Sequence, residues 1–370
     1  EIIEYWKSSP YLLNFMRHYS LKRLLKDQID APSAMLRTAI QAARPAMLDH
    51  DAIDAYAPLD PANGRMRAIM DDIFGQHLEQ NLWIPAAMPY YGEARAGAPL
   101  TKALIFSSWS MVPDAIAALL SYEAERRMGV GESGRRYFEQ HRLRPLQFRQ
   151  DHGRLAGLRA LLLIYPSPAL AELADPLAVF SETGVALSLE GMRSAVGDRL
   201  KPAIGALKEG AVSHQDAHSA EWAAPAVIDD LLGARSRAWL EAPHGMRALA
   251  SEDAFHDHVA ELAAAVKTHD IGALSDDLSD LLVDVALGSP AVCALRALKR
   301  ISPELAWDDP RLLSAAAEVA WSFRALFNQH DAVALLRRDT DDHYWRRVLA
   351  YCAQHNLQAV LDEYAHYLVD

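Results

Sequence analysis

Arginine side chains gather in one stretch of this chain, between residues 126 and 159. A guanidinium group binds phosphate oxygens in a two-pronged geometry, and the interleaved aromatic rings offer faces on which bases can stack. The stretch therefore predicts a nucleic-acid surface; the alternative is a solvated helix face that pairs with acidic parts of the chain. The nine arginines are Arg126, Arg127, Arg135, Arg136, Arg142, Arg144, Arg149, Arg154 and Arg159, the aromatic residues are Tyr137, Phe138 and Phe148, and the opposing acids are Glu132, Glu139 and Asp151.

Hydroxyl groups follow an apolar run upstream of the arginines. Ala103–Phe106 predicts a buried strand, and the polar residues come directly after it. Hydroxyls and backbone N–H groups at such a strand end, just before a helix, can receive phosphates. An ordinary turn without a ligand is the alternative. The predicted nucleic-acid-binding residues are Ser107, Ser108, Trp109, Arg135, Arg136, Arg142, Arg144, Arg149 and Arg154.

Three other patterns imitate chemical sites, and we interpret each as structural. The G-x-G-x-x-G run at Gly129–Gly134 follows a helix instead of a strand, so it predicts a helix end and a loop. Asp362–Glu363 imitates an ATPase box, but the sequence holds no G-x-x-x-x-G-K-[ST] phosphate loop, and the neighbouring apolar residues have helical spacing. The histidine pairs in segments 214–218 and 256–258 lack the three or four converging ligands of a metal site. We predict neither catalytic nor metal-binding residues.

The elements that must position these residues are mainly helical. Strand 103–107, a helix over 112–127 and a second strand over 160–165 fit one right-handed crossover unit. Ser110 is the expected N-cap of that helix. Trp83, Tyr90 and Tyr91 are expected to hold the Pro- and Gly-rich connector of residues 82–100 against a core. Downstream, apolar periodicity predicts helices over 186–200, 222–240, 252–267, 274–286, 291–299, 311–327, 332–338 and 343–368, with breaks that include Pro202 and Gly210.

The composition limits the class of protein. The 370 residues allow two or three compact units, and a net charge of -12 argues against nucleic-acid binding over the whole surface while allowing a local basic patch. The two cysteines, Cys293 and Cys352, are expected to be buried thiols in a reducing cytoplasm. No apolar run approaches 18 residues, so we predict a cytoplasmic protein without membrane contact. Because the chain begins with Glu1, we expect it to be a piece of a longer protein.

The motif K-x-L-I-F-S-x-W at Lys102–Trp109 resembles the strand that opens the second motor lobe of SNF2-like superfamily 2 helicases. The segments Tyr5–Arg23, Leu82–Tyr91 and Trp321–Asp370 are similar to other parts of the large bacterial members. The resemblance implies the middle of a helicase that couples ATP hydrolysis to movement on DNA or RNA. It also implies that ATP and magnesium are bound by other parts of the parent enzyme, with no cofactor in this chain.

We therefore predict a mainly α fold: a helical, bundle-like insertion around a small partial RecA-like α/β core. Residues 1–100 would form a helical connector into the second motor lobe, residues 101–166 the partial core with its Arg-rich loop, and residues 167–370 the helical insertion. Expected partners are DNA or RNA, the remaining helicase domains, and a protein on the acidic insertion. The chain alone is expected not to hydrolyse ATP. The alternative is a non-enzymatic, α-helical adaptor that binds proteins.

Overall fold

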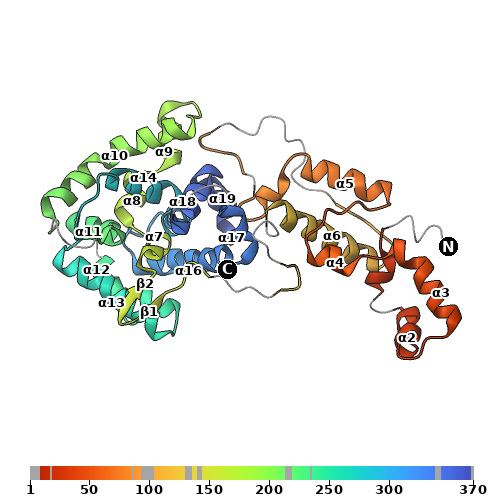
Figure 1. The fold of residues 1–370 in the computed structure, drawn as a ribbon. Helices are drawn as coiled ribbons and strands as arrows, with labels where there is room; N and C mark the ends of the chain where they lie inside the picture. Colours follow the sequence, from red (N-terminus) through yellow and green to blue (C-terminus); the bar gives the residue numbers. More distant parts are fainter. Residues whose placement is uncertain are drawn as a thin grey trace. The chain divides into compact units, whose positions relative to one another are not determined.

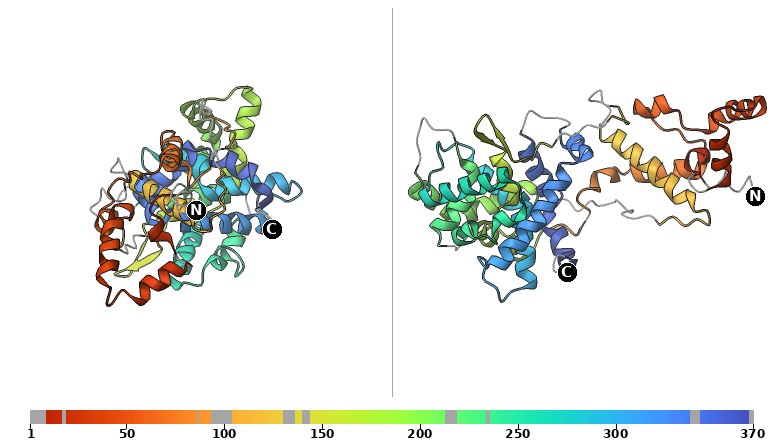
Figure 2. Two further views of the ribbon diagram at one scale, coloured as in Figure 1. Left: turned by 90° about the vertical axis from the view of Figure 1, so that its right-hand side faces the viewer. Right: turned by 90° about the horizontal axis from the view of Figure 1, so that it is seen from below.

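The protein is mainly helical, as predicted, with one two-stranded antiparallel sheet in the part of the chain that the structure describes (Figure 1). The computed structural model describes residues 9–16, 19–85, 87–92, 104–129, 136–139, 144–212, 219–233, 236–337 and 343–367. The chain divides into two compact units. Unit 1 comprises residues 1–82 and 97–142, and unit 2 comprises residues 83–96 and 143–370. Figure 2 shows the helices of each unit gathered in a cluster of their own.

Unit 1 is built around one long helix, α6 (Met111–Arg127). Val112, Ile116 and Leu119 are buried on one face, as their spacing predicts, and α5 packs against this helix. Ser110 occupies the predicted N-cap position, but its side chain makes no capping hydrogen bond. The other elements of unit 1 are η1 (Leu12–Phe15), α2 (Ser20–Asp27), α3 (Ala34–Ala43), η2 (Arg44–Ala46), α4 (His50–Asp54), α5 (Gly64–Phe74) and η3 (Leu78–Asn81).

Unit 2 is larger and holds the sheet together with most of the helices. Its first half contains β1 (Arg149–Asp151), β2 (Arg154–Ala156), η5 (Leu158–Ala160), α7 (Leu161–Ile164), α8 (Pro168–Leu173), α9 (Pro176–Thr183), α10 (Leu189–Gly210), η6 (Glu221–Ala223), α11 (Ala224–Leu231), α12 (Ser236–Glu241) and η7 (Met246–Leu249). Its second half contains α13 (Asp253–Thr268), α14 (Leu278–Gly288), α15 (Pro290–Ile301), α16 (Pro310–Phe327), α17 (His330–Leu336), α18 (Tyr344–Gln354), α19 (Leu357–Glu363) and η8 (Ala365–Tyr367).

Helix starts follow the local sequence closely. Ser, Asp or Asn stands at the N-cap of many helices, where the side-chain oxygen accepts a hydrogen bond from a backbone N–H that has no partner inside the helix. Proline often follows in the first turn, where its missing N–H costs nothing. The capping residues are Ser33 for α3, Asp49 for α4, Asn63 for α5, Ser167 for α8, Asp175 for α9, Ser188 for α10 and Asp309 for α16.

The core of unit 2 surrounds α15, which packs against α8, α14, α16 and α19. Every residue from Pro290 to Leu298 is buried, including the charged Arg296. The Arg296 guanidinium donates hydrogen bonds to the backbone carbonyls of Leu170, Ala171 and Ala174 at 2.8–2.9 Å. The carbonyls of Ala171 and Ala174 lie at the end of α8, and that of Leu170 also accepts from the N–H of Ala174 at 3.3 Å. Arg296 therefore acts as a buried cap for that helix.

The connector predicted to be held by aromatic residues does pack on the core of unit 2. Tyr91 is buried, and its hydroxyl donates to the carbonyl of Ala353 at 2.7 Å. The Asn356 side chain accepts from the backbone N–H groups of Tyr90 and Tyr91 and donates to the Tyr91 carbonyl at 3.0 Å. Trp83 and Tyr90 are partly buried against the same core, so the prediction is confirmed.

Both predicted strands are wrong. Residues 104–107 are in no strand and are exposed, with 83% of Leu104 and 89% of Phe106 accessible to solvent. A strand requires neighbours for its N–H and C=O groups, and none is present for this segment in the described residues. The second predicted strand, 160–165, contains the buried helix α7 instead. A short, continuously apolar run does not distinguish a buried strand from a buried helix. The partial RecA-like core therefore rests on the resemblance alone.

Two predictions for the helices of unit 2 are wrong. The single helix predicted over 222–240 is divided into η6, α11 and α12. The break expected at Pro202 is wrong, because α10 continues through this proline to Gly210. The two units also divide the chain at residues that differ from the predicted boundaries at 100 and 166. Among the described helices, none is by itself long and apolar enough to cross a membrane; α14 and α15 reach that length only together, across a 48° bend.

Candidate nucleic-acid interface

The predicted binding residues fall in both units. Ser107, Ser108, Trp109 and Arg136 belong to unit 1, whereas Arg144, Arg149 and Arg154 belong to unit 2. Arg135 and Arg142 lie outside the described residues. Each part of the interface is therefore described by itself.

The serine-rich turn of unit 1 leads directly into α6. Ser107 and Ser108 are exposed, and the Ser107 hydroxyl oxygen accepts a hydrogen bond from the backbone N–H of Trp109 at 3.1 Å. Trp109 is half-buried. The first turn of α6 already contains the carboxylate of Asp114, which opposes the binding of an anion at this helix N-terminus. The turn is thus accessible to a ligand but is a weak phosphate site on its own.

Three arginines of the Arg-rich stretch have described positions in unit 1, and all three are bound to carboxylates. Arg126 and Arg127 both donate to Glu123, at 2.6–2.8 Å and 2.8 Å. Arg136 donates to Asp54 at 2.9 Å, and the backbone N–H of Phe138 donates to the same carboxylate at 3.1 Å. The hydrogen bond from Arg136 is the main reason why the pKa of Asp54 lies below its usual value. Because their guanidinium groups are already hydrogen-bonded to carboxylates, these arginines are less suited to bind phosphate.

In unit 2, β1 and β2 form a hairpin joined by the two residues His152 and Gly153. Both have positive φ, 47° and 76°, as a tight turn that matches the twist of the strands requires. Arg149 pairs with Ala156, and Asp151 pairs with Arg154. Because side chains alternate along a strand, Arg149 and Arg154 lie on one face of the hairpin, and Gln150 lies on the other. The hairpin packs against α13.

The attachment of the hairpin to α13 uses the face opposite the arginines. Gln150 donates to the carboxylate of Asp257 at 3.3 Å, and Nε2 of His258 lies 3.0 Å from the carbonyl oxygen of Ala156. Gly157 follows with φ of 103°, and a Cβ at this position would lie 2.2 Å from the carbonyl oxygen of Gln147. Only glycine, which has no Cβ, fits this close approach. The path of the backbone after β2 therefore depends on Gly157.

Four arginines around this hairpin are exposed and have no ion-pair partner in the described ranges. They are Arg144, Arg149, Arg154 and Arg159. Their setting is acidic: unit 2 holds 22 of the chain's 37 Lys and Arg residues but 33 of its 49 Asp and Glu residues. We call these four residues the hairpin arginines. Arg149 and Arg154 share one face of the hairpin, and Arg144 and Arg159 flank the hairpin in the sequence of an acidic unit.

The aromatic residues interleaved with the arginines are not a continuous stacking surface. Phe148 is buried in the core of unit 2, where its ring lies parallel to that of Trp321 at 6.1 Å, so its interpretation as a stacking face is wrong. Arg324 covers Trp321, with its guanidinium carbon 3.7 Å from the centre of the ring. In unit 1, Phe138 is partly exposed but already stacks on His50 at 4.5 Å.

The motifs interpreted as structural have structural partners. Asp362 lies in α19 and accepts hydrogen bonds from Tyr90 and Arg300, so the box-like sequence is part of a helix, as predicted. His256 and His258 each contact a backbone carbonyl, at 2.8 Å from Ala250 and 3.0 Å from Ala156. The histidine pair of segment 214–218 lies outside the described residues.

The predicted helix end at Gly129 and the two predicted buried thiols are confirmed. Gly129 follows α6 with φ of 81°, which confirms that the glycine-rich run begins as a helix end. Cys293 and Cys352 are both buried, free thiols, also as predicted.

Sequence reasoning missed the hairpin and the role of Arg159. The run Asp151-His152-Gly153-Arg154 contains the signal, because glycine as the second residue of a two-residue turn is typical of a hairpin. Arg159 was recognised as part of the Arg-rich stretch but was not included in the predicted site. Comparison of the chain with protein-family models, with curated proteins and with solved structures gives no match.

Proposed function

We propose that this chain is a segment of an ATP-dependent nucleic-acid motor, and that it holds the sugar–phosphate backbone through the hairpin arginines. The observation that carries the proposal is that these side chains are exposed and have no ion-pair partner among the described residues, on an otherwise acidic unit. An exposed arginine without an ion-pair partner binds phosphate more favourably than a paired arginine, because no carboxylate must be released before binding. The resemblance of Lys102–Trp109 to a motor strand supports the same class of function.

The exposed segment Leu104–Phe106 is compatible with this proposal. Three large apolar residues in an extended stretch are costly to leave in water, and a sheet provided by another part of a motor would bury them. In that arrangement Ser107 and Ser108 would lie at the strand end, as the resemblance implies. The partial RecA-like core is therefore part of the proposal: its remaining strands would come from the parent enzyme.

The residues of this chain do not fit ATP and magnesium. The sequence has no phosphate loop, and the carboxylate that imitates an ATPase aspartate, Asp362, is bound to Arg300 inside the core. We therefore assign no step of ATP hydrolysis to this chain. Its proposed contribution is to position nucleic acid while other domains hydrolyse ATP.

Nucleic-acid binding can be measured by fluorescence anisotropy with labelled single-stranded DNA, double-stranded DNA and single-stranded RNA. We expect binding at low salt that weakens as salt rises, because counter-ions are released from the phosphates. Arg149→Ala with Arg154→Ala should reduce the slope of log K against log salt by about 1.4–1.8, or about 0.7–0.9 for each lost phosphate contact. The matched control is Arg311→Ala, since Arg311 is exposed but paired with Asp309. Absence of binding at 25 mM salt, or equal slopes for both variants, would refute the proposal.

The second candidate is a non-enzymatic helical adaptor that binds proteins. A specific observation favours it: unit 1 exposes several large apolar side chains on α2 and α3, which nucleic acid would not cover. The same titration separates the candidates, because an adaptor would not respond to the hairpin substitutions. The two functions can also coexist, since the apolar surface and the hairpin belong to different units.

A further inference from the structure

Asp151 lies on the same face of the hairpin as two of the hairpin arginines. The strand register places Asp151 directly opposite Arg154, and Arg149 lies two residues before Asp151 in β1. Directly opposite residues of an antiparallel pair point to the same side, with Cβ atoms about 4.5–5.5 Å apart. Residues two apart in one strand also share a side, at a spacing of about 7 Å. The face proposed to hold phosphate therefore carries a carboxylate beside its arginines.

The Asp151 carboxylate has no hydrogen bond to any other group in the part of the chain that the structure describes. Its side chain is 74% exposed, and Nε2 of His152 lies 3.6 Å from its Oδ1, which is beyond hydrogen-bonding distance. It forms no ion pair with Arg149 or Arg154 in these residues. An ionised carboxylate only accepts hydrogen bonds. Asp151 thus offers free acceptor oxygens next to two cationic groups.

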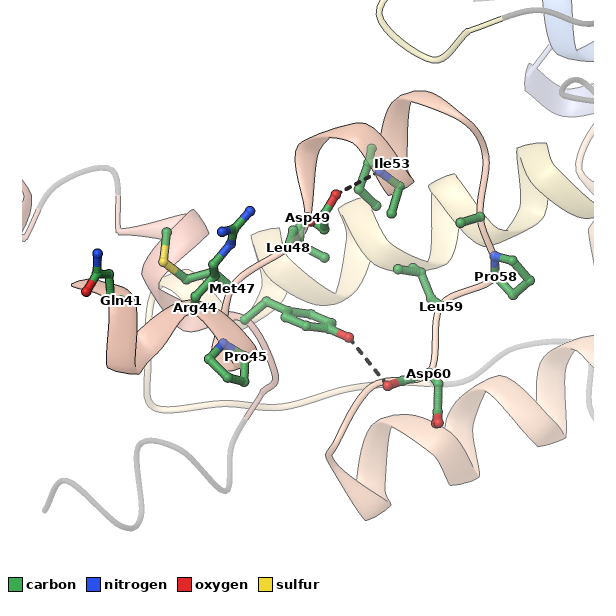
Figure 3. A pocket seen from close by; sticks show the side chains of 13 residues that line it. Gln41, Arg44, Pro45, Met47, Leu48, Asp49, Ile53, Pro58, Leu59 and Asp60 are labelled. Atoms are coloured by element: carbon green, nitrogen blue, oxygen red, sulfur yellow. Dashed lines mark hydrogen bonds between the residues drawn. The ribbon is translucent and has the colours of Figure 1, made fainter. Parts of the chain in front are cut away.

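Polar groups at another candidate site already have partners inside the chain. A pocket of about 510 Å³ in unit 1 contains Asp49, whose carboxylate accepts a hydrogen bond from the N–H of Ala52 at 2.9 Å (Figure 3). The hydroxyl of Tyr11, in the same pocket, donates to the carbonyl of Asp60 at 3.4 Å. These groups need no ligand to complete their hydrogen bonds, in contrast to Asp151.

The sugar–phosphate backbone of DNA offers this carboxylate nothing to bind, because all its oxygens only accept hydrogen bonds. In RNA each ribose adds a 2′-hydroxyl, which donates as well as accepts. A DNA strand on the arginine face would bring its phosphates beside an unpaired negative charge. An RNA strand would bring the same phosphates together with a donor for that charge. The face is therefore better matched to RNA than to DNA.

We propose that Asp151 makes the hairpin selective for RNA, by accepting a hydrogen bond from a ribose 2′-hydroxyl while Arg149 and Arg154 hold phosphates. The inference rests on the proposed function, since it assigns the kind of nucleic acid that the same face binds. Amino groups of bases also donate to carboxylates. A face that holds the backbone, however, meets the ribose before it meets the base edges. Asp151 is thus a specificity-determining residue.

The test compares single strands of about 12 uracil nucleotides that differ only at the 2′ position of the sugar, which carries hydroxyl, hydrogen, fluorine or O-methyl. Fluorescence anisotropy measures the affinity of the full chain for each strand at low salt. We expect the hydroxyl strand to bind at least about fivefold more tightly than the other three, because only it donates to a charged acceptor. The fluorine strand keeps an RNA-like sugar shape without the donor.

Substitutions at Asp151 make the test specific. Asp151→Ala should abolish the preference, so that the hydroxyl and hydrogen strands bind within about twofold of each other. The hydrogen strand should itself bind more tightly, because the carboxylate no longer repels its phosphates. Asp276→Ala removes the same charge from an exposed position of unit 2 outside the hairpin, and should leave the preference unchanged. Circular dichroism checks that both variants remain folded.

The outcomes separate this inference from the proposed function. Equal affinities of the unmodified chain for the four strands, or a preference that survives Asp151→Ala, would overturn the selectivity. If replacement of Arg149 and Arg154 still reduces the salt slope, the proposed function stands. Equally tight binding of the hydroxyl and fluorine strands would show that sugar shape is recognised, and would also refute the role of Asp151. Absence of binding to every strand would reject the proposed function and this inference together.

Discussion

Asp229 is a carboxylic acid whose buried environment changes its chemistry. It is fully buried and accepts hydrogen bonds from the hydroxyls of Tyr165 and Ser167, at 2.7 and 2.9 Å, and from the N–H of Ala169 at 2.8 Å. Burial is the main cause that raises its pKa from 3.8 to about 7. Three donors favour the carboxylate, but removal from water outweighs them. The site joins α11 to the start of α8.

This shift predicts how stability depends on pH. The folded state binds the Asp229 proton more tightly than the unfolded state, so stability falls as pH rises from about 4 to about 7. The contribution of this residue to the loss between pH 5 and pH 7 should be roughly 2–3 kcal/mol. Asp229→Asn should remove that part of the pH dependence, as measured by urea unfolding at pH 5, 6 and 7. Asp198→Asn, at an exposed position, is the control. Identical pH profiles for wild type and Asp229→Asn would contradict this assignment.

Arg296 is a charged residue that the fold uses as a cap. Within the described ranges its guanidinium has no carboxylate partner, and burial lowers its pKa. All its strong hydrogen bonds go to backbone carbonyls, including that of Ala286 at 2.8 Å. Replacement would leave several buried carbonyls without donors, and each costs about 1–3 kcal/mol.

Arg296→Met, which keeps an unbranched apolar stem but removes the guanidinium group, should therefore lower the free energy of unfolding by more than about 3 kcal/mol. Urea unfolding followed by circular dichroism measures it. Arg311→Met removes an exposed arginine paired with Asp309 and should change stability by less than about 1 kcal/mol. A loss of equal size in both variants would show that Arg296 has no special role in holding α8.

At the residue scale, sequence reasoning worked where the decisive information was local. It placed Cys293 and Cys352 in the core and assigned Asp362 to a helix. It did not separate paired from unpaired arginines, because the partner of Arg136 is Asp54, 82 positions away in the sequence. Such distant pairs are set by the tertiary fold, and spacing along the chain does not report them.

At the scale of elements, helix ends were predictable because caps, prolines and glycines act locally. The break at Gly210 is an example, because α10 ends at this residue. The two short apolar runs were not predictable, because their periodicity does not separate strand from helix. Residues 161–164 became helical inside a helical core, while residues 104–106 found no strand to pair with in the described part of the chain.

Helix packing gives a prediction at the same scale. α14 packs against α18, and a Cβ on Gly288 would lie 2.1 Å from the carbonyl oxygen of Leu349. Gly288→Ala should force the two helices apart and lower the free energy of unfolding by about 1–3 kcal/mol. Gly205, inside α10, has open space around a Cβ, so Gly205→Ala should instead raise stability by about 0.5–1 kcal/mol. Thermal unfolding compares them, and a stable Gly288→Ala protein would show that the helices can separate at little cost.

At the scale of the whole molecule, charge is distributed unevenly. Unit 1 holds 15 basic and 16 acidic residues, so nearly all of the net charge of -12 belongs to unit 2. The total charge, read from the sequence, argued against nucleic-acid binding and favoured an adaptor. In the structure, the hairpin arginines have no ion-pair partner among the described residues. Local phosphate binding is therefore feasible, although the net negative charge of unit 2 repels phosphate. The sequence alone lists these arginines. That they have no ion-pair partner among the described residues can be seen only in the structure.

The Asn356 clamp on Tyr90 and Tyr91 has a consequence for how the protein is made. Residues 91 and 356 are 265 positions apart. A ribosome that adds about 5–20 residues per second needs roughly 10–50 seconds to pass from one to the other. Throughout this interval the Tyr91 side chain has been synthesised but its binding site has not. Unit 2 therefore completes its fold only after residue 356 has been synthesised, and the aromatic connector is a segment that chaperones would have reason to cover until then.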